Sequence, residues 1–176
     1  MGVQIERMGS NITIHGAGKY GLSSPSDPLD LGNSGTSIRL MSGLLSAQSF
    51  NSQLCGDESL SKRPMARVIE PLSMMGALID SYESKPPLSI TGNQKLSAIN
   101  YTLPVASAQI KSCLLLAGLY AEGETCIVEN ITTRDHTERM LRGFGYPVNT
   151  SKEQISLIGG DELHACDIKV PSDISS

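Results

Sequence analysis

The sequence predicts an α/β fold built from repeated units, and two observations lead to this class. Segments with the apolar alternation of strands are interleaved with segments that have the apolar periodicity of helices, as in α/β proteins. The layout also occurs twice, since Gly43 and Gly118, and likewise Met65 and Met140, lie 75 positions apart. Such units bury the apolar faces of their helices by packing around one another.

The individual elements follow from local pattern. Strands are expected where short apolar runs alternate with polar residues and end near glycine, at 12–16, 50–57, 88–92, 125–130, 154–160 and 167–173. Helices are expected where a small polar cap precedes a periodic apolar run, at 32–48, 63–77, 106–123 and 135–145.

These elements divide the chain into units of about 1–88 and 89–153 and an incomplete unit at 154–176. The third unit stops before its helices, and the first opens directly on a strand pattern. A helix that is missing leaves the apolar face of its partner strand uncovered. We therefore expect residues 1–176 to be a partial globular domain of a longer protein.

Composition narrows the function classes. The 176 residues are 39% hydrophobic, enough for one domain with a sizeable core, and the net charge of −4 disfavours nonspecific binding to nucleic acid or anionic membranes. The amino terminus does not resemble a signal peptide, and no run of about 18 apolar residues occurs that could span a membrane. Neither nucleic acid nor a membrane is an expected partner.

The four cysteines form no CxxC pair and have no metal-like spacing with the histidines, so no metal site is expected. Cys113 lies in the apolar run CLLLAGL, where a buried thiol behaves as a small hydrophobic group. Reduced cysteines indicate a cytoplasmic location. Nothing in the composition points to a cofactor.

Two motifs suit the binding of anions. GNSGTSIR at 32–39 places Gly32 and Gly35 ahead of an apolar helix, so that free backbone N–H groups and the positive helix end can face an anion. An ordinary capped helix explains the same residues. SKRPMAR at 61–67 supplies forked guanidinium donors for a carboxylate or phosphate, although a solvated basic helix face is the alternative.

Two further motifs lie in the second unit. ASAQIK at 106–111 places Ser107 and Gln109 at a helix start, where capping alone also accounts for the serine. TTRDHTERM at 132–140 gathers charged residues that suggest acid–base chemistry by His136 or metal binding. Asp135 as a helix cap, with Glu138 in the first turn, is the more economical interpretation.

These strings, together with GDESLSKRPM at 56–65 and CLLLAGL, resemble the 5-enolpyruvylshikimate-3-phosphate synthase family along the whole chain. The resemblance implies repeated βαβαββ units of an "inside-out" α/β barrel, with about two units and the start of a third in an amino-terminal domain. A related family, the UDP-N-acetylglucosamine enolpyruvyl transferases, matches SAQIKS and RDHTERML less well.

The resemblance also implies substrates and roles. The enolpyruvyl group of phosphoenolpyruvate would pass to the 5-hydroxyl of shikimate 3-phosphate, in the pathway that leads to aromatic amino acids. Phosphoenolpyruvate, and glyphosate in its place, would contact Gly35, Arg63 and Gln109. Shikimate 3-phosphate would contact Ser107, the backbone of Ala108, Gln109 and Arg134.

No catalytic acid or base is assigned within this chain. In the family an amino-terminal motif supplies a lysine, a serine and an arginine to both substrates, and a carboxy-terminal domain that closes on the substrates supplies the acidic and remaining basic catalytic residues. Neither segment is expected here. Two function classes follow: part of an enolpyruvyl transferase that is inactive alone, or a noncatalytic module that binds anionic ligands or supports folding. Supplying the missing segments should restore turnover only in the first case.

Overall fold

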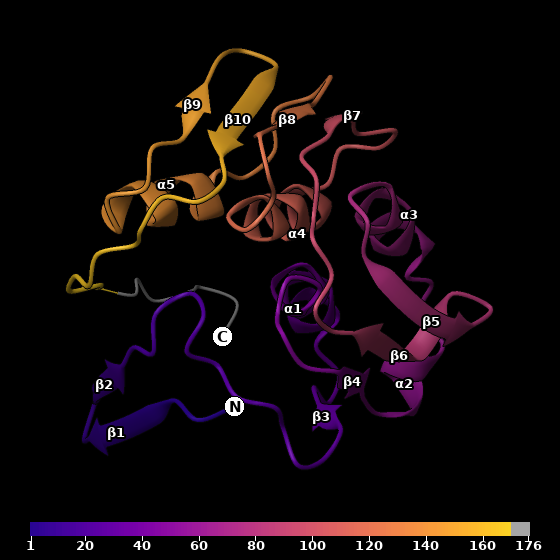
Figure 1. Cartoon of the computed structure of the whole chain (residues 1–176), viewed down its shortest axis with the longest axis vertical. Coiled ribbons are helices and arrows are strands. Elements are labelled where there is room, and N and C mark those ends of the chain that lie inside the picture. The colour runs from indigo at the N-terminus through magenta and orange to yellow at the C-terminus, as the bar shows by residue number, and fades with distance from the viewer. Residues whose placement is uncertain (170–176) are drawn as a thin grey trace.

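The computed structural model describes residues 1–169, which form two α/β units around one shared hydrophobic core (Figure 1). The first unit consists of β3 (Leu29–Asp30), α1 (Gly35–Leu45), β4 (Ser52–Cys55), α2 (Glu58–Ser61), α3 (Ala66–Met74), β5 (Leu78–Tyr82) and β6 (Lys85–Thr91). The second consists of β7 (Asn100–Thr102), α4 (Ala108–Gly118), β8 (Glu124–Val128), α5 (His136–Gly143), β9 (Asn149–Thr150) and β10 (Gln154–Ile158). Apart from the single turn of α2, both units have the order βαβαββ, which confirms the predicted repeat.

The two sheets have the same topology. Their strand orders are β3-β4-β6-β5 and β7-β8-β10-β9, and in each sheet the first pair is parallel whereas the others are antiparallel. A parallel pair needs a crossover connection, which α1 and α4 provide. Neither sheet closes into a barrel within the part of the chain that the structure describes.

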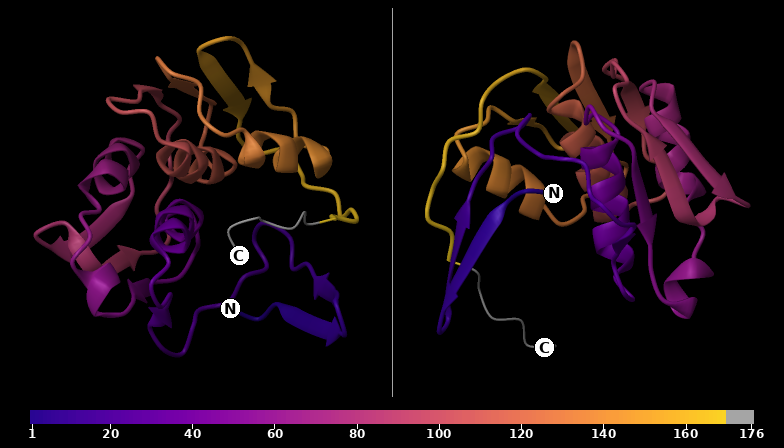
Figure 2. Two further views of the ribbon diagram at one scale, coloured as in Figure 1. Left: turned by 180° about the vertical axis from the view of Figure 1, so that it is seen from behind. Right: turned by 60° about the horizontal axis from the view of Figure 1, so that its bottom comes forward.

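Helices α1 and α4 lie side by side in the interior, and the two sheets lie on their outer sides (Figures 1 and 2). Gly43 permits this close approach, because a Cβ atom there would stand 2.1 Å from the backbone oxygen of Cys113. Apolar residues of both units fill the contact, among them Ile38, Leu45 and Leu114, all fully buried. The packing of α1 on α4 therefore fixes how the two helix N-termini lie relative to each other.

The strands that were expected to open the second and third units belong to the sheets of the preceding units. The strand expected at 88–92 to open the second unit is the end of β6, which pairs with β4 and β5 in the first sheet. The strand expected to open a third unit is β10, which pairs with β8 in the second sheet. The true opening strands, β3 and β7, have only two and three residues and were not predicted.

The strand expected at 12–16 is β2 (Asn11–His15), which within residues 1–169 pairs only with β1 (Gln4–Met8), in an exposed antiparallel hairpin. Figure 1 shows this hairpin apart from both sheets. The strand expected at 167–173 lies partly outside the described residues, and 167–169 are not in a strand. No helix between residues 1 and 169 is long and apolar enough to cross a membrane.

The 75-residue spacing does not hold throughout. The cap residues Ser34 and Ser107 occupy equivalent places 73 positions apart, whereas Met65 and Asp135, which precede α3 and α5, are 70 apart. Met65 is buried at the start of its helix, but Met140 is exposed inside α5. The two methionines are therefore not equivalent, because the connections between elements differ in length.

Candidate functional site

The candidate site lies where α1 and α4 begin. Each helix has a serine cap: the Ser34 hydroxyl accepts a bond of 3.1 Å from the backbone N–H of Ser37, and Ser107 accepts one of 3.4 Å from Ile110. Both caps confirm the helix starts expected from sequence. The two helix ends are joined directly, since Gln109 Nε2 donates to Thr36 Oγ1 at 2.9 Å.

A polar cleft opens at the start of α4. Its lining contains all four residues that the sequence assigned to shikimate 3-phosphate, together with neighbours from the loop that follows β8: Ala106, Ser107, Ala108, Gln109, Thr132, Thr133 and Arg134. Arg134 is exposed and makes no hydrogen bond or ion pair with another described residue. Its guanidinium is therefore available to a ligand in this cleft.

A second polar cleft lies beside Arg63 and is lined by Asp57, Glu58, Ser59, Lys62, Arg63 and Pro64. Arg63 donates hydrogen bonds to Asn33 and to Ser59. Asp57 caps α2, and the hydrogen bonds from Leu60 and Asn33 hold the pKa of its carboxyl below the usual value. A carboxylate that is charged at neutral pH therefore stands close to Arg63.

Gly35 adjoins this arginine, and the resemblance assigns both residues to phosphoenolpyruvate. A Cβ atom at Gly35 would lie 2.7 Å from Arg63 Nη1 and 3.0 Å from Arg39 Nη1. The space that glycine leaves is thus occupied by two guanidinium groups. Any larger residue would displace arginine side chains and alter the charge that a ligand meets there.

Arg39 is a residue of this region to which the sequence assigned no role. Its Nη1 atom donates to Gly35 O and to Gln109 Oε1, both at 2.9 Å, and Nη2 donates to Pro64 O at 3.5 Å. Burial lowers the pKa of Arg39, and the nearby positive charges of Arg63 and Arg67 add to this effect. The feature of the sequence that could have identified Arg39 is its position one helical turn after Gly35, on the same face of α1.

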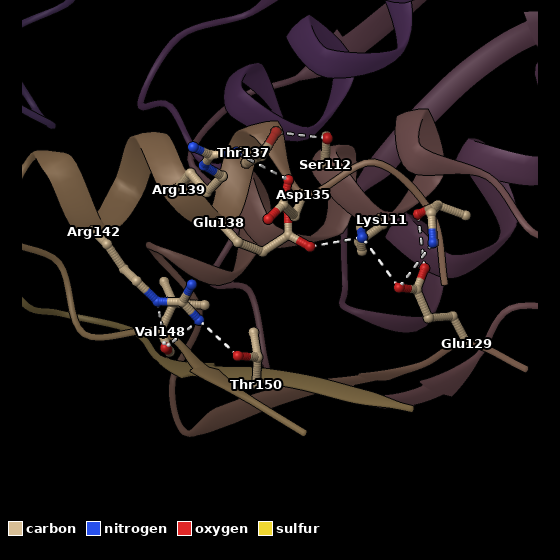
Figure 3. Close-up of polar contacts among 11 residues, drawn as sticks. Lys111, Ser112, Glu129, Asp135, Thr137, Glu138, Arg139, Arg142, Val148 and Thr150 are labelled. Atoms are coloured by element: carbon tan, nitrogen blue, oxygen red, sulfur yellow. Dashed lines mark hydrogen bonds and ion pairs between the residues drawn. The ribbon is translucent and has the colours of Figure 1, made fainter. Parts of the chain in front are cut away.

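A buried ion cluster, drawn in Figure 3, contacts the loop that lines the cleft. The Lys111 ammonium lies 3.2 Å from Glu129 and 2.6 Å from Glu138, and all three side chains are at most 3% exposed. Glu129 also accepts hydrogen bonds from the backbone N–H and the hydroxyl of Thr133. The cluster therefore ties α4 to the loop that carries Arg134.

The start of α5 differs in part from the prediction. Asp135 occupies the cap position, but its side chain makes no capping hydrogen bond. Glu138 is in the first turn as expected, yet it is buried and pairs with Lys111. Thr137 hydrogen-bonds Ser112 of α4 at 2.6 Å, and His136 is exposed. These contacts hold α5 against α4, so contacts between the two helices, rather than helix capping, determine the role of these residues.

The sequence and the fold both match one family of known proteins. The sequence model of the family EPSP synthase (3-phosphoshikimate 1-carboxyvinyltransferase) matches residues 1–176. The chain therefore belongs to the EPSP synthase family.

Among curated relatives, the 3-phosphoshikimate 1-carboxyvinyltransferase of Ruthia magnifica subsp. Calyptogena magnifica is 66% identical over 176 residues, which are 100% of this chain and 40% of the relative. The 3-phosphoshikimate 1-carboxyvinyltransferase of Hydrogenovibrio crunogenus is 59% identical over 183 residues, which cover 100% of this chain and 41% of the relative. A crystal structure of EPSP synthase from Acinetobacter baumannii superposes with a TM-score of 0.96 at 58% identity, over 99% of this chain and 40% of that one. The chain thus spans about two fifths of the length of these relatives.

Proposed function

We propose that this chain forms one wall of the active site of a 3-phosphoshikimate 1-carboxyvinyltransferase. That enzyme would transfer the enolpyruvyl group of phosphoenolpyruvate to the 5-hydroxyl of shikimate 3-phosphate. One observation carries the proposal: Gln109 lines the cleft at the start of α4 and also bonds Arg39, which lies with Arg63 beside Gly35 at the start of α1. Two anionic substrates can therefore bind next to each other.

Shikimate 3-phosphate is assigned to the cleft of α4. The Ser107 oxygen accepts from Ile110, so its own O–H proton remains free to donate to a phosphate oxygen. The first N–H groups of a helix have no intrahelical acceptor, which supports a role for the backbone of Ala108 and Gln109. Arg134 adds a charged donor from the opposite lining.

Phosphoenolpyruvate is assigned to the region of Gly35, Arg63 and Gln109. A guanidinium group binds carboxylate and phosphate oxygens with two parallel hydrogen bonds, which favours Arg63 as the main contact. The missing side chain of Gly35 leaves the space that Arg39 and Arg63 share. Glyphosate, an anion of related shape, is expected to compete there.

These residues would bind the negatively charged groups of the substrates, but none of them is assigned as the catalytic acid or base. We propose that the remaining length of the family's chains supplies these groups, and that this chain has no turnover by itself. The four cysteines, Cys55, Cys113, Cys126 and Cys166, are all free, which supports a reducing compartment such as the cytoplasm.

A titration followed by two-dimensional amide NMR tests the proposal. Shikimate 3-phosphate should shift the resonances of Ser107, Gln109 and Arg134. The Arg134→Ala variant should bind it with an affinity about tenfold lower, so that the shifts need more ligand to appear. The matched control is Arg139→Ala, because Arg139 is exposed on α5 and lies outside the cleft. Equal weakening by both variants would show that the response is nonspecific attraction to positive charge.

Complementation separates the two function classes. The chain is mixed with a second polypeptide that carries the rest of a relative's sequence, and phosphate release is measured with both substrates present. Release that needs both polypeptides supports the transferase. Binding of shikimate 3-phosphate without any restored release favours the noncatalytic module.

A further inference from the structure

We infer that Arg39 is a positioning residue that holds the Gln109 amide in one orientation, with its nitrogen end available to the oxygen atoms of an anion. The inference deepens the proposed function, since it concerns the residue shared by the two proposed substrate sites. It rests on the contacts of one half-buried arginine that links α1, α4 and the segment before α3.

The donor and acceptor chemistry of the side chains fixes the orientation. A glutamine amide can rotate by 180°, which exchanges a carbonyl acceptor for an NH₂ donor at the same place. Arg39 can only donate hydrogen bonds, so the Gln109 atom 2.9 Å from its Nη1 must be the carbonyl Oε1. Nε2 is then the atom that donates to Thr36 Oγ1.

This arrangement leaves a defined group for a ligand. Nε2 has two hydrogens, and Thr36 takes one of them, so the second remains for an oxygen atom in the cleft that Gln109 lines. The flipped amide would bring NH₂ against the Arg39 guanidinium and would offer a carbonyl oxygen to the anion. Both contacts are repulsive, and Arg39 therefore selects the anion-binding orientation.

Arg39 is itself held in place. Its Nη1 atom also donates to the backbone oxygen of Gly35 one turn earlier, at 2.9 Å, and Nη2 reaches Pro64 O. The neighbouring Arg63 lies close enough to Gly35 that a Cβ atom there would meet both guanidinium groups. The orienting bond thus stands beside the positive charge that attracts the anion.

The first test uses the side-chain NH₂ resonances of Gln109 in the free chain. In the parent they should differ from those of an exposed glutamine and exchange slowly with solvent. Arg39→Gln should move them toward exposed values, and Arg39→Lys should do the same, because an ammonium group lacks the fork that bonds Gly35 and Gln109 together. Arg67→Gln is the matched control, since Arg67 is an exposed arginine near Arg39 that makes no hydrogen bond to Gln109 among the described contacts.

The second test is a double-mutant cycle on binding of shikimate 3-phosphate. Gln109→Met should weaken binding about tenfold in the parent, but by less than about twofold in the Arg39→Gln background, where the amide is already misoriented. Equal losses in the two backgrounds would overturn the inference, as would Gln109 resonances that Arg39→Gln and Arg39→Lys leave unchanged. A chain that binds no shikimate 3-phosphate but shows the resonance changes would contradict the proposed function alone.

Discussion

Replacement of Lys111 by methionine is expected to destabilise the chain strongly. Methionine matches the length of the lysine stem but removes the charge that two buried carboxylates share. Glu129 keeps its bonds to Thr133, whereas one oxygen of Glu138 has no hydrogen-bond partner among the described residues even in the parent. The variant therefore leaves two buried negative charges without a counter-ion.

The size of the effect follows from burial. Removal of one partner from a buried ion pair costs about 3–5 kcal/mol, mostly because an uncompensated charge remains. Small domains are stable by about 5–15 kcal/mol, so this loss is a large part of the total. Glu138→Gln should cost less, about 1.5–3 kcal/mol, because it removes a charged hydrogen bond but leaves the remaining pair neutral.

Urea unfolding followed by circular dichroism measures these free energies. The matched control is Lys62→Met, since Lys62 pairs with Glu58 at the same 2.6 Å but the two side chains are 72% and 86% exposed. An exposed pair contributes about 0–1 kcal/mol. If Lys111→Met lowers the unfolding free energy no more than this control does, the buried charge balance is not what stabilises the cluster.

If Lys111→Met is already unfolded without urea, a triple variant still tests the role of the buried charges. Lys111→Met combined with Glu129→Gln and Glu138→Gln carries no buried charge and should recover most of the lost stability. Failure of this triple variant to recover would show that the lost hydrogen bonds of the ammonium group, and not the unbalanced charge, account for the destabilisation.

Three further predictions concern other parts of the fold. Gly43→Ala should lower the unfolding free energy by about 1–3 kcal/mol, because its Cβ would meet the backbone of Cys113, and a crystal structure should show α1 and α4 farther apart. Burial raises the pKa of the Cys113 thiol to about 12 from an ordinary 9.0. The neutral thiol therefore contributes stability that is complete below about pH 8.5 and is lost as the pH rises toward 12. Cys113→Ala should make the urea midpoint depend less on pH in the alkaline range, and an unchanged slope would contradict this. Hydrogen bonds from Leu60 and Asn33 lower the pKa of Asp57, so its charged cap stabilises α2 above about pH 4 and the benefit is lost as the pH falls through the folded pKa. Asp57→Ala should therefore reduce the urea midpoint more at pH 7 than in strong acid.

Much of the fold could be predicted because each long element has a local signal. The helix starts at α1 and α4 follow from their serine caps, and the existence of the repeat follows from recurring strand and helix patterns. The phase of the repeat could not be predicted in this way. A periodic pattern does not say which strand opens a unit, and β3 and β7 are too short to show an alternation of their own.

The site could be predicted only where a motif is contiguous. Ser107, Gln109 and Arg134 lie in two short strings, and the structure brings them into one cleft. Arg39 and Lys111 also lie in such strings, but their roles could not be predicted, because their partners are 70 and 18 or more residues away along the chain. A charged residue inside an apolar helix gives no indication of its partner until the tertiary packing is known.

Packing of the core consequently governs the chemistry of the cleft. Gly43 lets α1 and α4 approach, and this approach sets the distance between Arg39 on one helix and Gln109 on the other. Lys111, half a turn beyond Gln109, fixes the loop that carries Arg134 from the other side. Because both contacts depend on rigid helices, a change in the core at Gly43 should alter ligand binding even though it touches no ligand, whereas a change in the exposed β1–β2 hairpin should not.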